Sequence, residues 1–210
     1  MSTLPPWVHR EIRAGIGTHR ARSCGLEVHL SSLRVVDEAG TPVARDCSTV
    51  GEIAVKSPAN MVGYWRRPDL TAEVFRDGGG WMRTGDVAAW DEDGFVYIVD
   101  RAKDMVISGG ENIYPAQVEA CLYRHPAVLE CAVFGVPDAT WGEALKAVIV
   151  LRPGTSATEA EIIEHTRREL ASYMKPKSVD FSAGLPKGPT GKILKRDLRA
   201  PYWEGREREV

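Results

Sequence analysis

The first half of the chain alternates apolar and polar residues in short runs, a pattern typical of half-buried β-strands. Turns rich in Asp and Gly separate these runs at residues 37–40 and 91–94, and such spacing favours β-hairpins. A short helix is expected at residues 70–75. The predicted strands lie at residues 33–36, 41–43, 51–56, 87–90 and 95–99. We therefore predict a small antiparallel sheet, or part of a barrel, over residues 30–100.

The second half alternates strands with helices. Residues 128–136 and 144–151 are rich in Val, Ile and Ala, as buried strands are. Pro115 opens a predicted helix, and Thr158 and Glu161 form a capping-box pattern before another. The expected apolar face of that second helix carries Ile162, Ile163, Thr166, Leu170 and Tyr173. The remaining predicted elements are a strand at residues 178–181 and a basic helix at residues 193–199. With the short apolar run before Pro115 counted as a strand, the order up to residue 181 is β-α-β-β-α-β, which indicates an α+β fold.

The two halves meet in residues 100–115, where a charged segment precedes a short apolar run and a pair of glycines. The charges keep the segment at the surface, and Gly109 and Gly110 let the backbone approach another backbone or a ligand closely. Taken alone, this composition fits a polar linker, a short strand and a turn as well as a binding element, since turn glycines are common.

The sequence of residues 100–115 resembles the hinge signature of the adenylate-forming superfamily, which contains acyl-CoA synthetases, firefly luciferases and the adenylation modules of peptide synthetases. It reads Asp-Arg-Ala-Lys-Asp-Met-Val-Ile-Ser-Gly-Gly-Glu-Asn-Ile-Tyr-Pro. Two further segments match in the right order: residues 81–86 resemble the family's Thr-Gly-Asp nucleotide element, and residues 185–192 resemble its terminal lysine loop. The Ser-Gly-Gly-Glu-Asn version at residues 108–112 is most similar to fatty-acyl and related CoA ligases.

The resemblance implies an α+β fold in which a small antiparallel β subdomain is joined by a hinge to a compact α+β domain. Residues 30–102 are expected to be the terminal, antiparallel β subdomain of the family's larger N-terminal lobe, and residues 103–200 its compact C-terminal lid domain. Residues 1–29 do not match the family. We expect a disordered leader there, although a non-native translation start is equally open and an Arg-rich, acid-poor start also fits a transit sequence. Residues 201–210 are expected to form a tail.

The resemblance also implies roles for single residues. Asp86 is expected to hold both ribose hydroxyls of ATP, since an ionised carboxylate offers two acceptor oxygens, and Thr84 belongs to the same nucleotide-binding element. Arg101 is expected to contact the ribose or the phosphates. Lys192 is expected to bridge the acyl carboxylate and the α-phosphate during adenylation. Without the resemblance, Asp86 fits a turn residue, and Arg101 and Lys192 fit solvated surface charges.

Lys103 lies at the family's hinge, where a few backbone angles absorb a swing of the C-terminal domain between an adenylating and a thioester-forming pose. In the second pose Gly109 and Gly110 are expected to line the tunnel for the pantetheine arm of CoA. A side chain there would obstruct the thiol.

The implied activity is that of an acid–thiol ligase, an acyl-CoA synthetase: a fatty acid, ATP and CoA give acyl-CoA, AMP and pyrophosphate. The ligands of Mg²⁺ are expected outside this chain. The family's Ser/Thr/Gly-rich phosphate loop and its Tyr-Gly-x-Thr-Glu element are not found in the 210 residues, so we expect a truncated chain that is catalytically incomplete alone. Two alternatives remain: a non-catalytic lid or regulatory module acting on a separate N-terminal lobe, and an adenylation module that serves a carrier protein.

Composition narrows the partners and the compartment. The net charge of −2 offers no electrostatic footprint for nucleic acid or an anionic membrane, and no apolar run approaches the ~20 residues of a membrane span. The four cysteines have no metal-ligand spacing, so we expect no metal site in the chain and a reducing cytoplasm. Cys121 and Cys131 are expected in the core. The sequence indicates neither the length of the acyl chain nor the oligomeric state.

Overall fold

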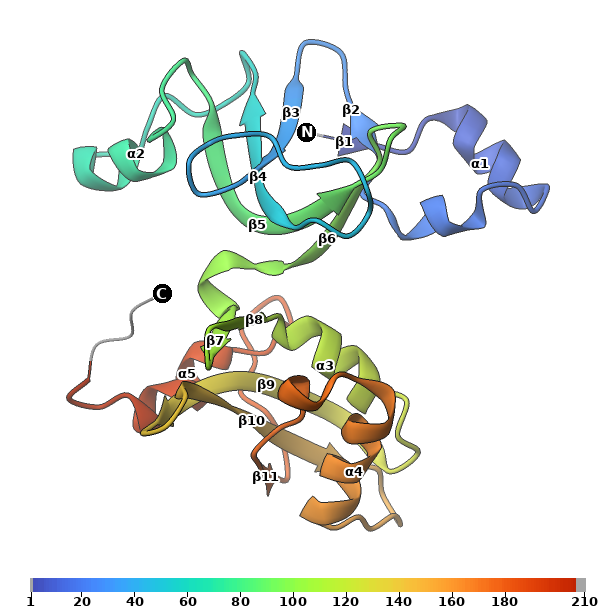
Figure 1. Ribbon diagram of the computed structural model, residues 1–210, viewed down its shortest axis with the longest axis vertical. Coiled ribbons are helices and arrows are strands. Elements are labelled where there is room, and N and C mark those ends of the chain that lie inside the picture. The colour runs from blue at the N-terminus through green and yellow to red at the C-terminus, as the bar shows by residue number, and fades with distance from the viewer. Residues whose placement is uncertain (1, 207–210) are drawn as a thin grey trace. The chain divides into compact units, whose positions relative to one another are not determined.

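The chain divides into two compact units, Met1–Ala102 and Lys103–Val210. The computed structural model describes residues 2–206, and Figure 1 labels the elements of both units. The division falls within the segment in which the hinge is expected. Residues 207–210 of the expected tail lie outside the described residues.

The first unit is built on an antiparallel sheet in the order β3-β4-β5-β6. Its strands are β3 (Ser32–Val36), β4 (Gly51–Lys56), β5 (Met82–Trp90) and β6 (Val96–Arg101). Helix α2 (Pro68–Val74) lies between β4 and β5 in the sequence. The core of the sheet contains Val35, Ile53, Val55, Ala88, Trp90 and Val96. The antiparallel sheet expected from the alternating pattern is confirmed.

One predicted strand is wrong. Residues 41–43 make only an isolated bridge between Val36 and Pro42. Because Pro42 has no N–H to donate, a regular ladder cannot run through it. Strand β3 pairs instead with β4 over its whole length.

The N-terminal segment is folded, in contrast to the disordered leader expected there. Val8 is fully buried, and the rings of Trp7 and Phe95 meet edge to face with their centroids 6.3 Å apart. Arg20 lies over the ring of Phe95 and forms an ion pair with Asp93 at 2.6 Å. These long-range contacts hold the segment, and the local sequence gives no sign of them. Its elements are β1 (Ser2–Thr3), α1 (Pro6–Arg13), η1 (Thr18–Arg22) and β2 (Leu26–Glu27).

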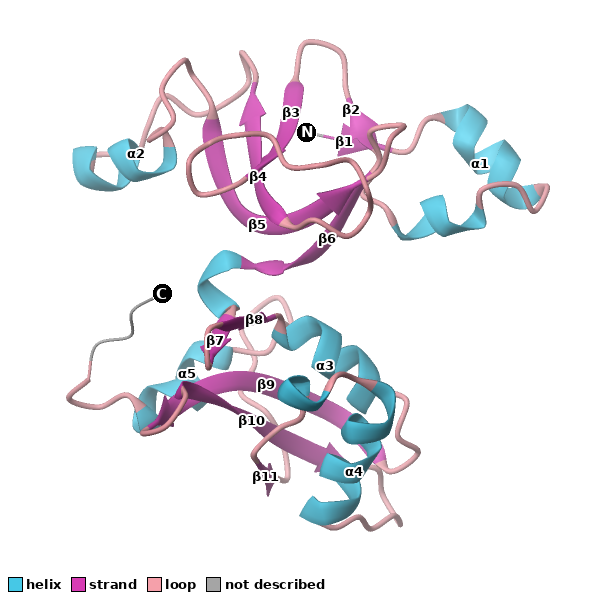
Figure 2. Cartoon of the chain, in the orientation of Figure 1, coloured by secondary structure: helices cyan, strands magenta, loops and turns pink. Residues whose placement is uncertain are grey.

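The second unit folds around a mixed five-stranded sheet in the order β11-β10-β7-β8, with β9 paired to β10. Strand β10 runs antiparallel to β9 and β7 and parallel to β11. The strands are β7 (Val106–Ser108), β8 (Glu111–Ile113), β9 (Val128–Asp138), β10 (Gly142–Leu151) and β11 (Ser178–Phe181). The helices, cyan in Figure 2, are α3 (Pro115–Leu122), α4 (Glu159–Glu169) and α5 (Lys195–Arg199). The α+β class is confirmed.

Both faces of the β9–β10 hairpin are buried, which explains its nearly continuous apolar sequence. On one face, the hairpin meets α3 and α4 in a cluster that includes Val118, Leu122, Cys131, Val133, Leu145 and Ile162. On the other, it meets the segment that carries Lys192, in a cluster that includes Ala132, Phe134, Val148, Leu185, Ile193 and Leu198. The predicted burial of Cys121 and Cys131 is confirmed.

Helix α4 begins as predicted but ends early. The Thr158 and Glu161 capping box is present, and α4 ends at Glu169 because Leu170 takes an extended conformation (φ −128°, ψ 164°). The helical period therefore stops there. Tyr173, expected on the apolar face, is 49% exposed, and Met174 is buried in its place.

Candidate functional site

Asp86 and Arg101 lie directly opposite each other on neighbouring strands of the first unit. Arg101 Nε is 3.1 Å from Asp86 Oδ1, and both side chains reach solvent (56% and 31% exposed, respectively). An ion pair this exposed contributes about 0–1 kcal/mol to stability. A ligand can therefore replace it at little cost, and the pair offers a carboxylate and a guanidinium side by side.

The residues before Asp86 form an irregular step in strand β5. The pairing with β4 shifts register between Glu52 and Ala54, and Gly85 adopts a positive φ of 76°. The hydroxyl of Thr84 donates to the carbonyl of Ile53 at 3.0 Å and accepts the N–H of Asp86 at 3.2 Å. Thr84 thus holds residues 84–86, the turn within β5 that presents Asp86. A direct contact of Thr84 with nucleotide stays a prediction.

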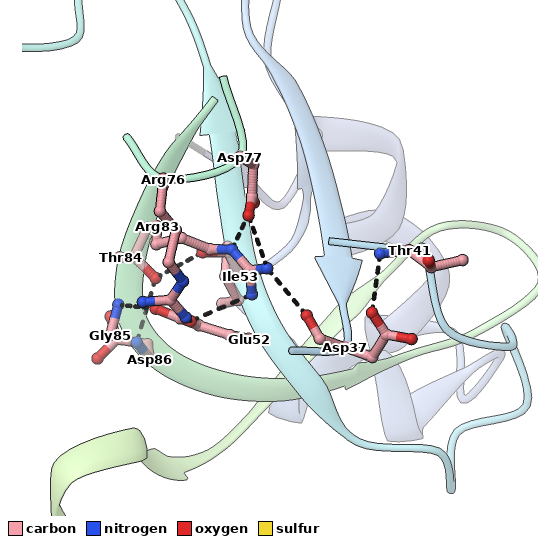
Figure 3. Close-up of polar contacts among 10 residues, drawn as sticks. All are labelled: Asp37, Thr41, Glu52, Ile53, Arg76, Asp77, Arg83, Thr84, Gly85 and Asp86. Carbon is pink, nitrogen blue, oxygen red and sulfur yellow. Dashed lines mark hydrogen bonds and ion pairs between the residues drawn. The ribbon is translucent and has the colours of Figure 1, made fainter. Parts of the chain in front are cut away.

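Arg83, which directly precedes Thr84, is a buried arginine that the sequence reading missed; Figure 3 shows it with its acidic partners. Arg83 is 3% exposed, and its guanidinium donates to Asp77 at 2.5 and 3.0 Å. It also donates to Glu52 at 3.2 Å and to the carbonyl of Asp37 at 2.9 Å. The hydrogen bond from Arg83 holds the pKa of Asp77 below its ordinary value. The sequence predicted a strand only at residues 87–90, so no local pattern marked Arg83, earlier in β5, as buried.

Lys192 stands on a tight loop of the second unit. The Gly188 N–H donates to the Lys192 carbonyl at 2.9 Å, and the Leu194 N–H donates to the Pro186 carbonyl at 2.8 Å. Gly191 takes a positive φ of 78° that closes the loop. Within residues 2–206 the Lys192 side chain is exposed and makes no ion pair or hydrogen bond. Its ammonium group is therefore available to a ligand.

The loop is fastened on both sides. Ile193 packs on the β9–β10 hairpin. Lys195, at the start of α5, forms an ion pair with Glu119 of α3 at 2.7 Å, and both side chains are largely buried. The same Glu119 carboxylate accepts the N–H of Val133 at 2.7 Å. Helix α3 and the sheet thus hold the chain that carries Lys192.

Gly109 and Gly110 form the turn between β7 and β8, with φ of 60° and 84°. The Gly109 N–H donates to the Trp141 carbonyl at 2.9 Å. A Cβ at Gly109 would lie 2.6 Å from the Trp141 ring, whereas a Cβ at Gly110 would meet open space. Trp141 is 55% exposed. The packing of Trp141 is thus a reason for Gly109 that does not involve CoA.

Lys103 lies in the short 3-10 helix η2 (Ala102–Asp104), at the point where the chain divides. Thr84, Asp86 and Arg101 belong to the first unit, and Lys192 with the glycine turn belongs to the second. The structure thus brings the three predicted nucleotide residues together. The roles of all these residues stay predictions.

Residues 2–206 contain no group of three or more His, Cys, Asp or Glu side chains placed to hold a metal ion. Burial raises the pKa of the Cys131 thiol to about 12, which keeps it protonated and unreactive. No helix in this described part of the chain is both long and apolar enough to cross a bilayer.

Residues 117–192 match the family described as the AMP-binding enzyme C-terminal domain. A feruloyl-CoA synthase from Amycolatopsis sp. is 49% identical over 180 residues, which cover 86% of this chain and 36% of that protein. A medium/long-chain-fatty-acid–CoA ligase from Mycobacterium tuberculosis is 43% identical over 198 residues, covering 91% of this chain and 34% of the ligase. The chain spans about a third of the length of the curated relatives it matches.

The chain is also similar to solved structures in both fold and sequence. ATP-bound MatB from Rhodopseudomonas palustris matches with a TM-score of 0.80 and 40% identity, over 86% of this chain and 36% of that one. The amide bond synthetase McbA from Marinactinospora thermotolerans matches with a TM-score of 0.80 and 35% identity, over 96% of this chain and 39% of that one.

Proposed function

We propose that this chain, which belongs to the adenylate-forming (AMP-binding) enzymes, is the C-terminal part of an ATP-dependent acyl-CoA synthetase. The carboxylate of the acid attacks the α-phosphorus of ATP and pyrophosphate leaves. The thiol of CoA then attacks the acyl carbonyl and AMP leaves. The observation that carries the proposal is an available ammonium group, Lys192, on a loop that a folded domain holds firmly.

In this proposal the first unit supplies one edge of the nucleotide site. The Asp86 carboxylate accepts the two ribose hydroxyls in place of its exposed pair with Arg101. Arg101 then turns its guanidinium to the ribose or the phosphates, which its planar set of donors suits. This combination of an acceptor, Asp86, and a donor, Arg101, fits ATP because a vicinal diol needs acceptors and a phosphate needs donors.

Lys192 is the cation of the first step. It lies between the incoming carboxylate and the α-phosphate, two groups that repel each other. At a distance of ~4 Å and an effective dielectric constant near 20, such a charge contributes about 4 kcal/mol. A contribution of that size corresponds to roughly three orders of magnitude in rate.

For the second step, the backbone at Lys103 absorbs the motion of the C-terminal domain. The Gly109–Gly110 turn then lies along the pantetheine arm of CoA. Mg²⁺ accompanies ATP on ligands outside this chain, and the acid binds to an N-terminal lobe. We place the reaction in the cytoplasm, where cysteines such as the four in this chain stay reduced.

The two half-reactions of the intact enzyme, with its N-terminal lobe, separate these roles. Lys192→Ala should slow pyrophosphate release by about three orders of magnitude, because the bridging charge is lost. It should leave thioester formation from supplied acyl adenylate nearly unchanged. Stopped assays of each step give both rates.

The matched control is Lys175→Ala, which removes another exposed lysine of the same unit and should alter neither step. Equal damage to both steps by Lys192→Ala would contradict the role. Robust ATP–pyrophosphate exchange by residues 1–210 alone would contradict the proposal that the chain is incomplete.

A second candidate function is amide formation, favoured by the likeness to an amide bond synthetase over 96% of this chain. The adenylation step would be the same, and an amine would replace CoA as the acceptor. Supplying acyl adenylate with either CoA or a primary amine distinguishes the two.

A further inference from the structure

We propose that Glu52 is a positioning residue for Asp86: its carboxylate holds the N–H of Gly85 and thereby fixes the direction in which the turn presents Asp86. The inference rests on the proposed role of Asp86 in nucleotide binding. It adds a residue outside every motif that pointed to that role, since Glu52 lies 34 positions earlier in the chain.

The contacts of Glu52 divide between its two oxygens (Figure 3). Oε1 accepts the Gly85 N–H at 2.9 Å. Oε2 accepts Nη1 of Arg83 at 3.2 Å and Nη2 of Arg76 at 2.9 Å. The side chain of Glu52 is only 13% exposed. One oxygen thus serves the turn while the other is held by two guanidinium groups.

The turn needs this acceptor because the strand ladder does not supply one. The regular pairing of β4 with β5 breaks between Glu52 and Ala54, and Gly85 lies in the part of β5 that this break leaves out of register. Its N–H finds the carboxylate of Glu52 instead of a backbone carbonyl. Because glycine has no side chain and a wide choice of backbone angles, losing this bond would free the residue that precedes Asp86.

Arg83 fixes Glu52 in turn. Its guanidinium is buried, and it donates to Asp77 and to the Asp37 carbonyl as well as to Glu52. A buried cation keeps its anionic partners because unpairing it is costly. Asp77 therefore shares the burial and the cation with Glu52, but among the described residues it makes no hydrogen bond to residues 84–86, so it provides a matched control.

The first experiment measures backbone amide exchange by NMR on this chain. Glu52→Met keeps the volume but removes the acceptor, and the exchange of Gly85 should rise about tenfold or more, as the loss of a hydrogen bond to a charged group implies. Glu52→Gln keeps an acceptor oxygen, and Gly85 should stay protected. Asp77→Asn should leave Gly85 protected as well.

The result that would overturn the proposal is an unchanged Gly85 in Glu52→Met, or an equal rise in Asp77→Asn. If Glu52→Met does not fold, Glu52→Ser, which is too short to reach the amide, takes its place with the same expected rise. Loss of Gly85 protection in a folded Glu52→Gln would also count against the proposal.

The second experiment uses the intact enzyme and compares ATP with 2′-deoxy-ATP. Glu52→Met should raise the KM for ATP about tenfold and leave the KM for the acid unchanged. It should also reduce the preference for ATP towards that of Asp86→Ala, whereas Asp77→Asn should keep the preference. A purely structural role would lower kcat for both nucleotides alike.

The two experiments separate the two proposals. If the wild-type enzyme does not distinguish ATP from 2′-deoxy-ATP, the proposed role of Asp86 fails, and the exchange of Gly85 still decides whether Glu52 holds the turn. If the wild type does distinguish them and Glu52→Met keeps that preference, the positioning role fails and the role of Asp86 stands.

Discussion

At the scale of single residues, two neighbouring glycines differ in the space around them. Gly109 and Gly110 share a turn and both take positive φ, so the sequence motif treats them alike. The structure separates them, because the Trp141 ring occupies the space beside Gly109 and leaves Gly110 open. A loss of CoA-dependent activity on changing Gly109 would therefore mix two causes.

Substitution by alanine tests this difference through the free energy of unfolding, measured by urea denaturation. Gly110→Ala should lower it by about 1–2 kcal/mol, the strain of an L-residue in the left-handed region. Gly109→Ala should lower it by about 1–3 kcal/mol more, through the clash with Trp141. The extra loss should vanish in a Trp141→Ala background. If both single variants are equally destabilised, the ring does not limit Gly109.

At the scale of elements, a pair of histidines joins helix α4 to the turn that follows helix α3. The rings of His125 and His165 meet edge to face with centroids 5.1 Å apart. His165 Nε2 lies 3.0 Å from the Cys121 carbonyl, and His125 Nδ1 accepts the N–H of Ala127 at 3.2 Å. Burial, and then the charge of His165, lower the pKa of His125, while Glu161 opposes that shift. The pair thus favours neutral His125.

This pair predicts a loss of stability in acid. The folded pKa of His125 lies below the unfolded value of about 6.5, so the unfolded state binds more protons between the two. The free energy of unfolding of the second unit should be highest above about pH 7, and it should fall as the pH drops through about 6.5.

The measurement is urea unfolding across this range, followed through amide signals of α3 and α4. His125→Asn, which keeps an acceptor for Ala127, should reduce the slope, while His29→Asn in the other unit should not. An unaltered slope in His125→Asn would contradict the assignment.

At the scale of the whole molecule, each unit has a core of its own. The clusters behind α3 and α4 and behind the Lys192 loop lie entirely within Lys103–Val210, and the β-sheet cluster lies entirely within Met1–Ala102. A domain of ~100 residues buries enough surface to fold alone. In the proposed function the second unit moves as one body, and such a motion needs this independence.

Expressed alone, residues 103–210 should therefore fold. They should show near-UV circular dichroism and a single cooperative thermal transition. The spectra of the two separately expressed units should add up to that of the whole chain. A compact second unit without near-UV signal, as in a molten globule, would show that its core needs the first unit.

The sequence by itself determined the elements whose signals are local. Helix α3 begins at its proline, α4 begins at its capping box, and β4 and β11 fall on the residues that the pattern predicts. Period and capping act within a few residues, so they can be read without the fold. The resemblance likewise assigned roles to Asp86, Arg101 and Lys192 from short motifs, and these roles stay predictions.

Only the tertiary structure decided what depends on distant partners. The N-terminal segment folds because Trp7 and Arg20 meet Phe95, and the turn before Asp86 is held by a glutamate from another strand. Tyr173 was expected on the apolar face of α4, but it is exposed because the helix ends before it and the helical period stops at Leu170. Such contacts join residues far apart in the sequence, and no local pattern records which partner a side chain will meet.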